Sequence, residues 1–136
     1  MFGKKTNKPQ NQIDSLIGTG THVVGDINFS GGLRIDGHVR GNITATGDKP
    51  STLMLSEQAS IEGKIQVSHA VINGTVVGPV HADEYLELQA KARVSGDVYY
   101  RALEIQLGAT IEGMLLHQDH VGQGNKVMTL VPAIGD

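Results

Sequence analysis

Six histidines offer the most direct chemistry in this sequence, because imidazole is a common ligand of zinc and related metals. A catalytic zinc site needs three converging protein ligands and one open position. His22, His38 and His81 stand beside apolar residues in separate segments, so we expect them to point outward from different parts of the fold. The others have no partner at a ligand-like spacing or lie near an irregular C-terminal end: His69, His117 and His120. The sequence therefore predicts no metal ion and no cofactor.

Carboxylates and glycines form no recognisable catalytic set either. Asp26, Asp36 and Asp97 each lie beside a glycine, and stacking their charges in one column would be unfavourable. Lys64 interrupts that series, so we interpret these acids as outward strand or turn residues. No helical pattern follows the glycines, as a phosphate-binding loop requires. With no cysteine for thiolate chemistry and no Ser/His/Asp set, the chain is predicted not to be an enzyme.

A repeat organises the chain instead. The unit is apolar-x-Gly-x-apolar, as in Val23–Ile27 and Ile61–Ile65, and its glycines stand 16, 22, 15, 18 and 17 residues apart. The long interval contains a loop insertion at 47–51. The fourth copy is the shortest and carries Ala70 and Pro79, so we expect a local irregularity there. The six glycines form a predicted structural column: Gly25, Gly41, Gly63, Gly78, Gly96 and Gly113.

The period within each unit is two, which is typical of strands with one inward face. A repeat of about 17 residues accommodates three short strands and their bends, which predicts a parallel β-helix of about six turns. Only residues 83–91 have a composition that suits a helix, and their register with the repeat favours a strand. The variable turn length differs from the strict 18-residue period of left-handed β-helices. We therefore predict an all-β, right-handed, triangular solenoid.

The composition agrees with this fold. The chain has 136 residues, 18 glycines, no tryptophan and only five Phe or Tyr residues. Most cores use aromatic rings to fill volume, so this core is expected to be narrow enough for aliphatic side chains alone. The glycine column is expected to face inward, where it takes the least room, or to mark where a strand bends.

The ends of such a stack expose unpaired strand edges. No amphipathic helix precedes Ile17 or follows Leu116, so we expect other copies of the chain to cover both ends. Alternatively, residues 121–134 fold back as a cap at the C-terminal end. The predicted polymerisation residues are the apolar positions of the first and last turns: Ile17, Val23, Ile27, Leu103, Ile105, Ile111 and Leu115.

Charge divides the chain into a basic tail and an acidic body. Residues 1–12 carry three lysines and no acid, whereas the rest carries 8 basic and 14 acidic residues, which argues against nucleic-acid binding by the core. No apolar run reaches the roughly 18–20 residues that span a bilayer. We predict a disordered basic tail over 1–13, a polymerisation core over 14–117 and a short flexible tail over 118–136.

The segments 13–18, 24–27 and 31–37 resemble the start of the core domain of bactofilins, and 103–105 and 108–113 resemble its later repeats. The resemblance covers about residues 13–116. It implies a bacterial cytoskeletal protein with a right-handed β-helix, which polymerises without nucleotide into non-polar filaments joined head-to-head and tail-to-tail. It also implies a cytoplasmic location at the inner face of the membrane, and a role as scaffold for cell-wall enzymes and for shape or polarity factors.

The N-terminus resembles the membrane-targeting segment of the same family. Its apolar residues would enter the lipid interface while lysines meet anionic headgroups, and the residues concerned are Met1, Phe2, Lys4, Lys5 and Lys8. Two alternatives remain open. One is a left-handed β-helix enzyme of acyltransferase or carbonic-anhydrase type, and the other is a monomeric solenoid that acts as a binding module.

Overall fold

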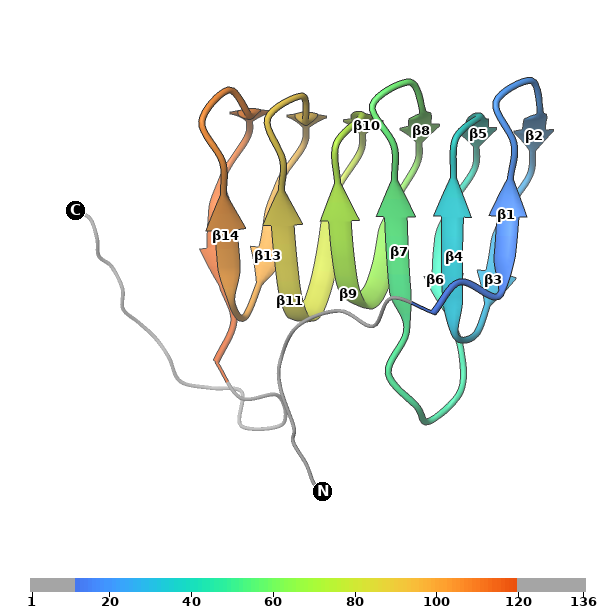
Figure 1. Ribbon diagram of the computed structural model, residues 1–136. Helices are drawn as coiled ribbons and strands as arrows, with labels where there is room; N and C mark the ends of the chain where they lie inside the picture. The colour runs from blue at the N-terminus through green and yellow to red at the C-terminus, as the bar shows by residue number, and fades with distance from the viewer. Residues whose placement is uncertain (1–11, 120–136) are drawn as a thin grey trace.

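The computed structural model describes residues 12–119, whose secondary structure is all strands and turns (Figure 1). In Figure 1 the chain climbs the near side through β1, crosses the top to β2 and descends the far side through β3. It advances toward β14 as it turns, so the coil is right-handed. All strand pairs within this coil are parallel, and one of its sheets has six strands, one from each turn. The predicted right-handed β-helix of about six turns is confirmed.

Each turn contributes one strand to each of three faces. Face 1 contains β1 (Ser15–Ile17), β4 (Gly32–Ile35), β7 (Thr52–Leu55), the second half of β9 (Ile65–Ile72), the second half of β11 (Val80–Leu88), and β14 (Leu103–Ile105). Face 2 contains β2 (His22–Val24), β5 (His38–Arg40), β8 (Ser60–Glu62), β10 (Thr75–Val77), β12 (Arg93–Ser95) and β15 (Thr110–Glu112). Face 3 contains β3 (Ile27–Phe29), β6 (Ile43–Ala45), the first halves of β9 and β11, β13 (Val98–Tyr100) and β16 (Leu115–His117).

The irregular segments follow the interruptions in the repeat. Residues 46–51 form a loop between β6 and β7 that extends beyond the coil (Figure 1). The register of β9 against β11 shifts between Ala82 and Tyr85, where the fourth copy passes into the fifth. The segment from Asp83 to Leu88 is a strand despite its helix-friendly composition. These three features agree with the sequence-based expectations.

Stacked aliphatic side chains fill the interior. In the face 2 column, Val39, Ile61 and Val76 are no more than 1 % exposed, and the face 3 column is equally buried at Ile43, Ile65 and Val80. The same inward position recurs on successive turns, so each side chain packs on its own kind above and below. Branched aliphatic residues suit this arrangement, since they fit pleated strands and have few rotamers.

The expectation that aliphatic residues alone fill the core is wrong at one corner. Phe29 belongs to the core and is 8 % exposed. It lies opposite Ala45 in the register of β3 and β6, and Tyr100 lies opposite Ala82 in the register of β11 and β13. The small neighbour leaves room for the ring, so aromatic residues fit the column where alanine occupies the adjacent turn.

The six repeat glycines form a column, but they do not face inward. Each lies half-buried or exposed at the corner between faces 2 and 3, with a φ between +135° and +158°. From the second turn onward, a Cβ added at the glycine would collide with the backbone carbonyl of the glycine one turn earlier. The column therefore marks where the strand bends and where successive backbones approach closely.

At three of the five rungs, the residue after the repeat glycine links neighbouring turns. A side-chain oxygen of Asp26 accepts the backbone N–H of Asn42 at 2.8 Å, and that of Asn42 accepts the N–H of Lys64 at 2.9 Å. Lys64 has no acceptor to offer, and the residue at the next rung is Pro79, which has no N–H to donate. The two departures from the pattern compensate each other, and the ladder resumes with Asp97 and the N–H of Met114 at 3.0 Å.

Replacing one interior glycine separates backbone strain from steric overlap. Gly63→Ala should destabilise the fold by about 2–4 kcal/mol, because it combines a positive φ with a collision against Gly41. Gly25→Ala is the matched control, since it has a φ of +135° but nothing within 4 Å of the added Cβ. It should cost only about 1–2 kcal/mol. Urea denaturation of dilute protein measures both, and equal losses would contradict the close-approach explanation.

Candidate polymerisation surfaces

The C-terminal end of the rod exposes positions that are core positions in every interior turn. Leu88 and Val98 are 0 % exposed, whereas their partners one turn later, Ile105 and Leu115, are each 45 % exposed. Leu103 and Ile111 are partly buried against the same core. Within residues 12–119 no further turn follows, so the last layer of the core forms an apolar end face.

Two exposed apolar residues lie at the corners of the last turn. Leu107 is 97 % exposed and occupies the corner position where the previous turn has Ala90. Met114 is 59 % exposed and lies one rung beyond Asp97, at the end of the side-chain ladder. No later turn within the described residues presents an N–H for position 114 to accept, so a polar side chain is not needed there. Interior turns also expose these corner positions, as at Ala90 and Pro79, so Leu107 and Met114 add apolar surface at the corners of the last turn, beside the core layer.

The N-terminal end has a different character. Ile17, Val23 and Ile27 lie partly buried on the first turn, where they pack against the core. Leu16 and Val24 are 60 % and 80 % exposed, but they point outward from faces 1 and 2. At the corner, Asp26 is exposed and turns its carboxylate toward the second turn. This end is therefore more polar around its rim than the C-terminal end.

The sides of the rod carry polar and aromatic ladders. The Tyr85 hydroxyl donates to Glu104 at 2.8 Å. The pKa of Tyr85 is raised, mainly by burial and to a smaller extent by this hydrogen bond. The His81 ring stacks on Tyr99 with ring centroids 4.2 Å apart. The pKa of His81 is lowered, mainly by burial and to a smaller extent by the positive charge of Lys64. Burial also raises the pKa of Asp83, at the irregularity in β11. These side chains contact residues of neighbouring turns, so they stabilise the stack along its axis.

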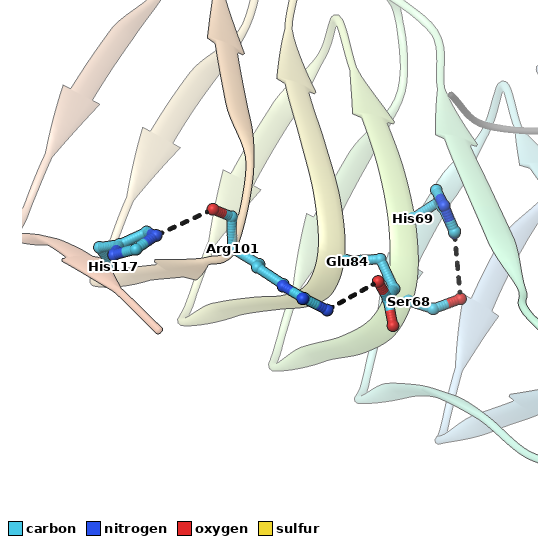
Figure 2. A network of polar contacts seen from close by, with 5 residues as sticks. All are labelled: Ser68, His69, Glu84, Arg101 and His117. Atoms are coloured by element: carbon cyan, nitrogen blue, oxygen red, sulfur yellow. Dashed lines mark hydrogen bonds and ion pairs between the residues drawn. The ribbon is translucent and has the colours of Figure 1, made fainter. Parts of the chain in front are cut away.

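The corner between faces 3 and 1 carries the polar contacts drawn in Figure 2. The Ser68 hydroxyl lies 3.3 Å from His69 Nδ1, but it donates to the Ser51 carbonyl at 2.8 Å. Arg101 pairs with Glu84 at 3.4 Å, and His117 Nε2 lies 3.0 Å from the Arg101 carbonyl. The neighbouring residues Ser68 and His69 therefore help to join adjacent turns at this corner. The Ser68 hydroxyl is hydrogen-bonded to the backbone carbonyl of Ser51 on the preceding turn.

All seven predicted polymerisation residues lie in the first or last turn, and the structure adds two exposed apolar residues of the last turn that the sequence analysis did not single out. Leu107 and Met114 are more exposed than any of the seven. The sequence could have indicated them, because each is a larger or more apolar residue than the one a repeat earlier, Ala90 and Asp97 respectively. The sequence analysis also treated His22 and His38 as unrelated because they lie on different turns, yet the structure stacks them. The predicted membrane-binding residues and the alternative cap over 121–134 lie outside the described residues.

Residues 12–119 therefore form a right-handed parallel β-solenoid whose last turn exposes apolar core positions, and this is the class of fold that the comparisons test. The family model of the bactofilins, described as polymer-forming cytoskeletal, matches residues 15–115. The chain belongs to the bactofilin family of filament-forming cytoskeletal proteins.

Relatives and a solved structure agree with this assignment. The chain is 26 % identical to bactofilin BacP of Myxococcus xanthus over 110 residues, which cover 81 % of this chain and 44 % of BacP. It therefore spans less than half the length of that relative. It is 28 % identical to BacO of the same organism, with 74 % of this chain and 76 % of BacO covered. The cryo-EM reconstruction of Thermus thermophilus bactofilin double helical filaments superposes with a TM-score of 0.57 at 27 % identity, covering 75 % of this chain and 98 % of that one.

Proposed function

We propose that this chain assembles end to end, without nucleotide, into non-polar filaments at the cytoplasmic face of the membrane. In this role it is a structural scaffold that recruits cell-wall enzymes or polarity proteins, and it is not an enzyme. The alternative of a left-handed β-helix enzyme loses its basis because the coil is right-handed. The solved bactofilin named for its double helical filaments supports the assembly part of the proposal.

The observation that carries the proposal is the apolar C-terminal end face. Ile105, Leu107, Met114 and Leu115 are between 45 % and 97 % exposed, and they lie together on one turn. Burying such a surface against another copy releases water and is favourable in proportion to its area. Assembly driven in this way needs no nucleotide, because the stabilising surface is built into the folded chain.

The chemistry of the two ends favours joints between like ends. If one copy continued the coil of another head to tail, the exposed Asp26 corner of the second would stack on Met114 of the first. Met114 has no side-chain acceptor for the incoming backbone N–H of Asp26, so that N–H would lack the side-chain partner that Asn42, Lys64 and Met114 have within the rod, which is unfavourable. A two-fold joint places Met114 against the apolar end face of the second copy instead, and a filament built of two-fold joints has no polarity.

Membrane attachment rests on the N-terminal tail. Lys4, Lys5 and Lys8 would each contribute about 1 kcal/mol near an anionic surface. One tail would bind weakly, but a filament presents many tails, and avidity makes the attachment stable. Residues 12–119 contain no helix long and apolar enough to cross a bilayer.

A charge on the apolar end face should block one joint. Leu107→Arg is the sharper test, because a side chain that is 97 % exposed contributes little to the folded protomer. Leu115→Arg tests the core column of the same face. Both variants should give short oligomers, since the charge would be buried without a partner. Negative-stain microscopy and sedimentation at physiological salt measure filament length.

Ser95→Arg is the matched control for these variants. It adds the same charge to an exposed outward position of β12, one turn inside the rod and opposite Glu112. This variant should form filaments of normal length. Long filaments from Leu107→Arg and Leu115→Arg would contradict the end-face joint, and discrete particles from the unmodified chain would favour the monomeric binding module.

Deleting residues 1–8 should separate membrane attachment from assembly. The truncated chain should still polymerise, but it should no longer co-sediment with vesicles that contain phosphatidylglycerol. A variant with Lys4, Lys5 and Lys8 changed to Gln keeps Met1 and Phe2 and should lose most of the salt-sensitive binding. Retained vesicle binding by the truncated chain would place the membrane contact on the core.

A further inference from the structure

The three strands of the last turn alternate their side chains in two different ways. β14 and β16 have an inward position at each end of the strand, whereas β15 has one only at its centre, Ile111. These positions follow from the register, since Ile111 pairs with the buried Val94 and Ile105 with the buried Leu88. The inward positions of the last turn are Leu103, Ile105, Ile111, Leu115 and His117.

The backbone of the last turn follows the same alternation. In a parallel ladder the N–H and C=O groups of one residue point to one neighbouring strand, and those of the next residue point to the other. Thr110 donates its N–H to the carbonyl of Ala92 at 2.9 Å, and the carbonyl of Glu112 accepts the N–H of Gly96 at 2.9 Å. Thr110 and Glu112 are outward positions, and the bonds of β14 and β16 to the preceding turn show the same pattern. The inward residues therefore point their backbone groups away from the preceding turn, toward the end of the rod.

A two-fold joint between two such ends allows three arrangements. The axis lies across the rod, so the strands of the two copies run antiparallel where they meet. In a triangular coil the axis passes through the middle of one face and through the opposite corner. The last strand of that face then pairs with the same strand of the second copy, and the last strands of the other two faces exchange partners. The arrangements differ in whether β14, β15 or β16 lies on the axis.

The axis through β15 brings inward positions together on every face. Ile111 of one copy lies opposite Ile111 of the other, and β14 lies along β16. In that second pairing, Ile105 lies opposite Leu115, and Leu103 lies opposite His117. Directly opposite residues of an antiparallel pair can exchange both N–H···O=C bonds, and all these residues point their backbone groups toward the joint. The sheet on each face then continues into the second copy.

The other two axes oppose unlike positions. With β14 on the axis, β15 lies along β16, so the inward Ile111 meets the outward Leu116 and their backbone groups do not face each other. Glu104 would also lie opposite Glu104 of the second copy, and like charges in that relation are unfavourable. With β16 on the axis, Ile111 meets the outward Glu104 instead. Neither arrangement satisfies the backbone on all three faces.

The corners and the pitch of the coil favour the same axis. Leu107 lies at the corner between faces 1 and 2, and Met114 lies at the corner between faces 2 and 3. The axis through β15 exchanges these corners, so the exposed Leu107 of each copy meets the exposed Met114 of the other. The coil also advances by one strand spacing, about 4.8 Å, in each turn, so β16 lies further along the rod than β14. Pairing β14 with β16 compensates for this difference and closes the three faces evenly.

We propose that the C-terminal joint is a two-fold, antiparallel β-sheet joint whose axis passes through Ile111 on face 2. The partner is a second copy of this chain, and the inference rests on the proposed function because it requires a joint between like ends. Three last strands from each copy form the contact, together with the corner pairs of Leu107 and Met114. On the outer side of β15, Thr110 of one copy lies opposite Glu112 of the other, where the hydroxyl can donate to the carboxylate.

Cross-linking between the two corners tests the axis. The chain has no cysteine, so one substitution introduces a single thiol at a chosen place. Filaments assembled from an equimolar mixture of Leu107→Cys and Met114→Cys and treated with a short bismaleimide should give linked dimers. Each dimer should contain one chain of each variant, which mass spectrometry detects when one variant is isotope-labelled. Filaments of either variant alone should give no linked dimers.

Each competing arrangement gives a different product. An axis through β14 links Met114→Cys to itself, and an axis through β16 links Leu107→Cys to itself. Head-to-tail stacking links Met114→Cys to Asp26→Cys, and a cap formed by residues 121–134 gives no link between chains. Any of these results would overturn the proposed joint. Ser95→Cys is the matched control, because it places a thiol at an exposed position one turn inside the rod, and it should give no linked dimers.

A charge exchange on face 2 tests the register. Thr110→Glu should raise the critical concentration for assembly about two- to tenfold, because the added carboxylate opposes Glu112 on both sides of the axis. Adding Glu112→Lys to this variant should restore assembly, since the opposed charges are then unlike. Thr75→Glu is the matched control: it adds the same charge to the same exposed column, also beside Arg93, and should leave the critical concentration unchanged. Sedimentation over a concentration series measures each variant.

The outcomes separate this joint from the proposed assembly. Suppose that the unmodified chain forms filaments but the thiol mixture gives no mixed dimers, or that Glu112→Lys fails to rescue Thr110→Glu. The axis through Ile111 is then wrong, and the proposed assembly stands. If the unmodified chain forms no filaments, the proposed assembly fails and this joint fails with it.

Discussion

Every turn of this coil depends on the turns beside it. A single turn cannot bury its three inward columns or pair its backbone groups, because both the apolar contacts and the parallel hydrogen bonds lie along the axis. Ile61 and Val76 are fully buried because a turn lies on either side, whereas Ile105 and Leu115 are half exposed for want of one. The interaction that makes the rod fold is therefore the same interaction that its ends leave incomplete.

The stacking of turns is incomplete in a different way at each end of the rod. At the C-terminal end, apolar residues extend from the core to the corners through Leu107 and Met114. At the N-terminal end, the corner carries Asp26 and the rim carries His22, so polar groups surround the partly buried column. Surfaces that differ this much complement each other poorly, which is the physical reason for proposing that each end pairs with its own kind.

The repeat made most of the fold predictable from sequence. Glycine spacing determined the number of turns, and the period of two placed Val39, Ile61 and their counterparts in the core. Two features of the interior were not predictable in the same way. The glycine column could mean small volume or a bend, and only the backbone angles of residues such as Gly63 distinguish them. Phe29 fits the core because Ala45 lies beside it, which is a relation between turns rather than a property of either residue.

The candidate sites show the same limit more clearly. His22 and His38 are 16 residues apart, a spacing that would be meaningless on a helix or in a loop but equals one turn of this coil. Two residues that are one turn apart in sequence lie side by side on adjacent strands of this coil. Separation in sequence must therefore be converted to a number of turns before two side chains are judged to be far apart. Lys64 and Pro79 show the rule inside the rod, since the missing acceptor of one is matched by the missing donor of the other. The proposed filament extends the rule to a second molecule: Met114 has no later turn within the described residues, so in such a filament the residue that suits it would belong to another copy.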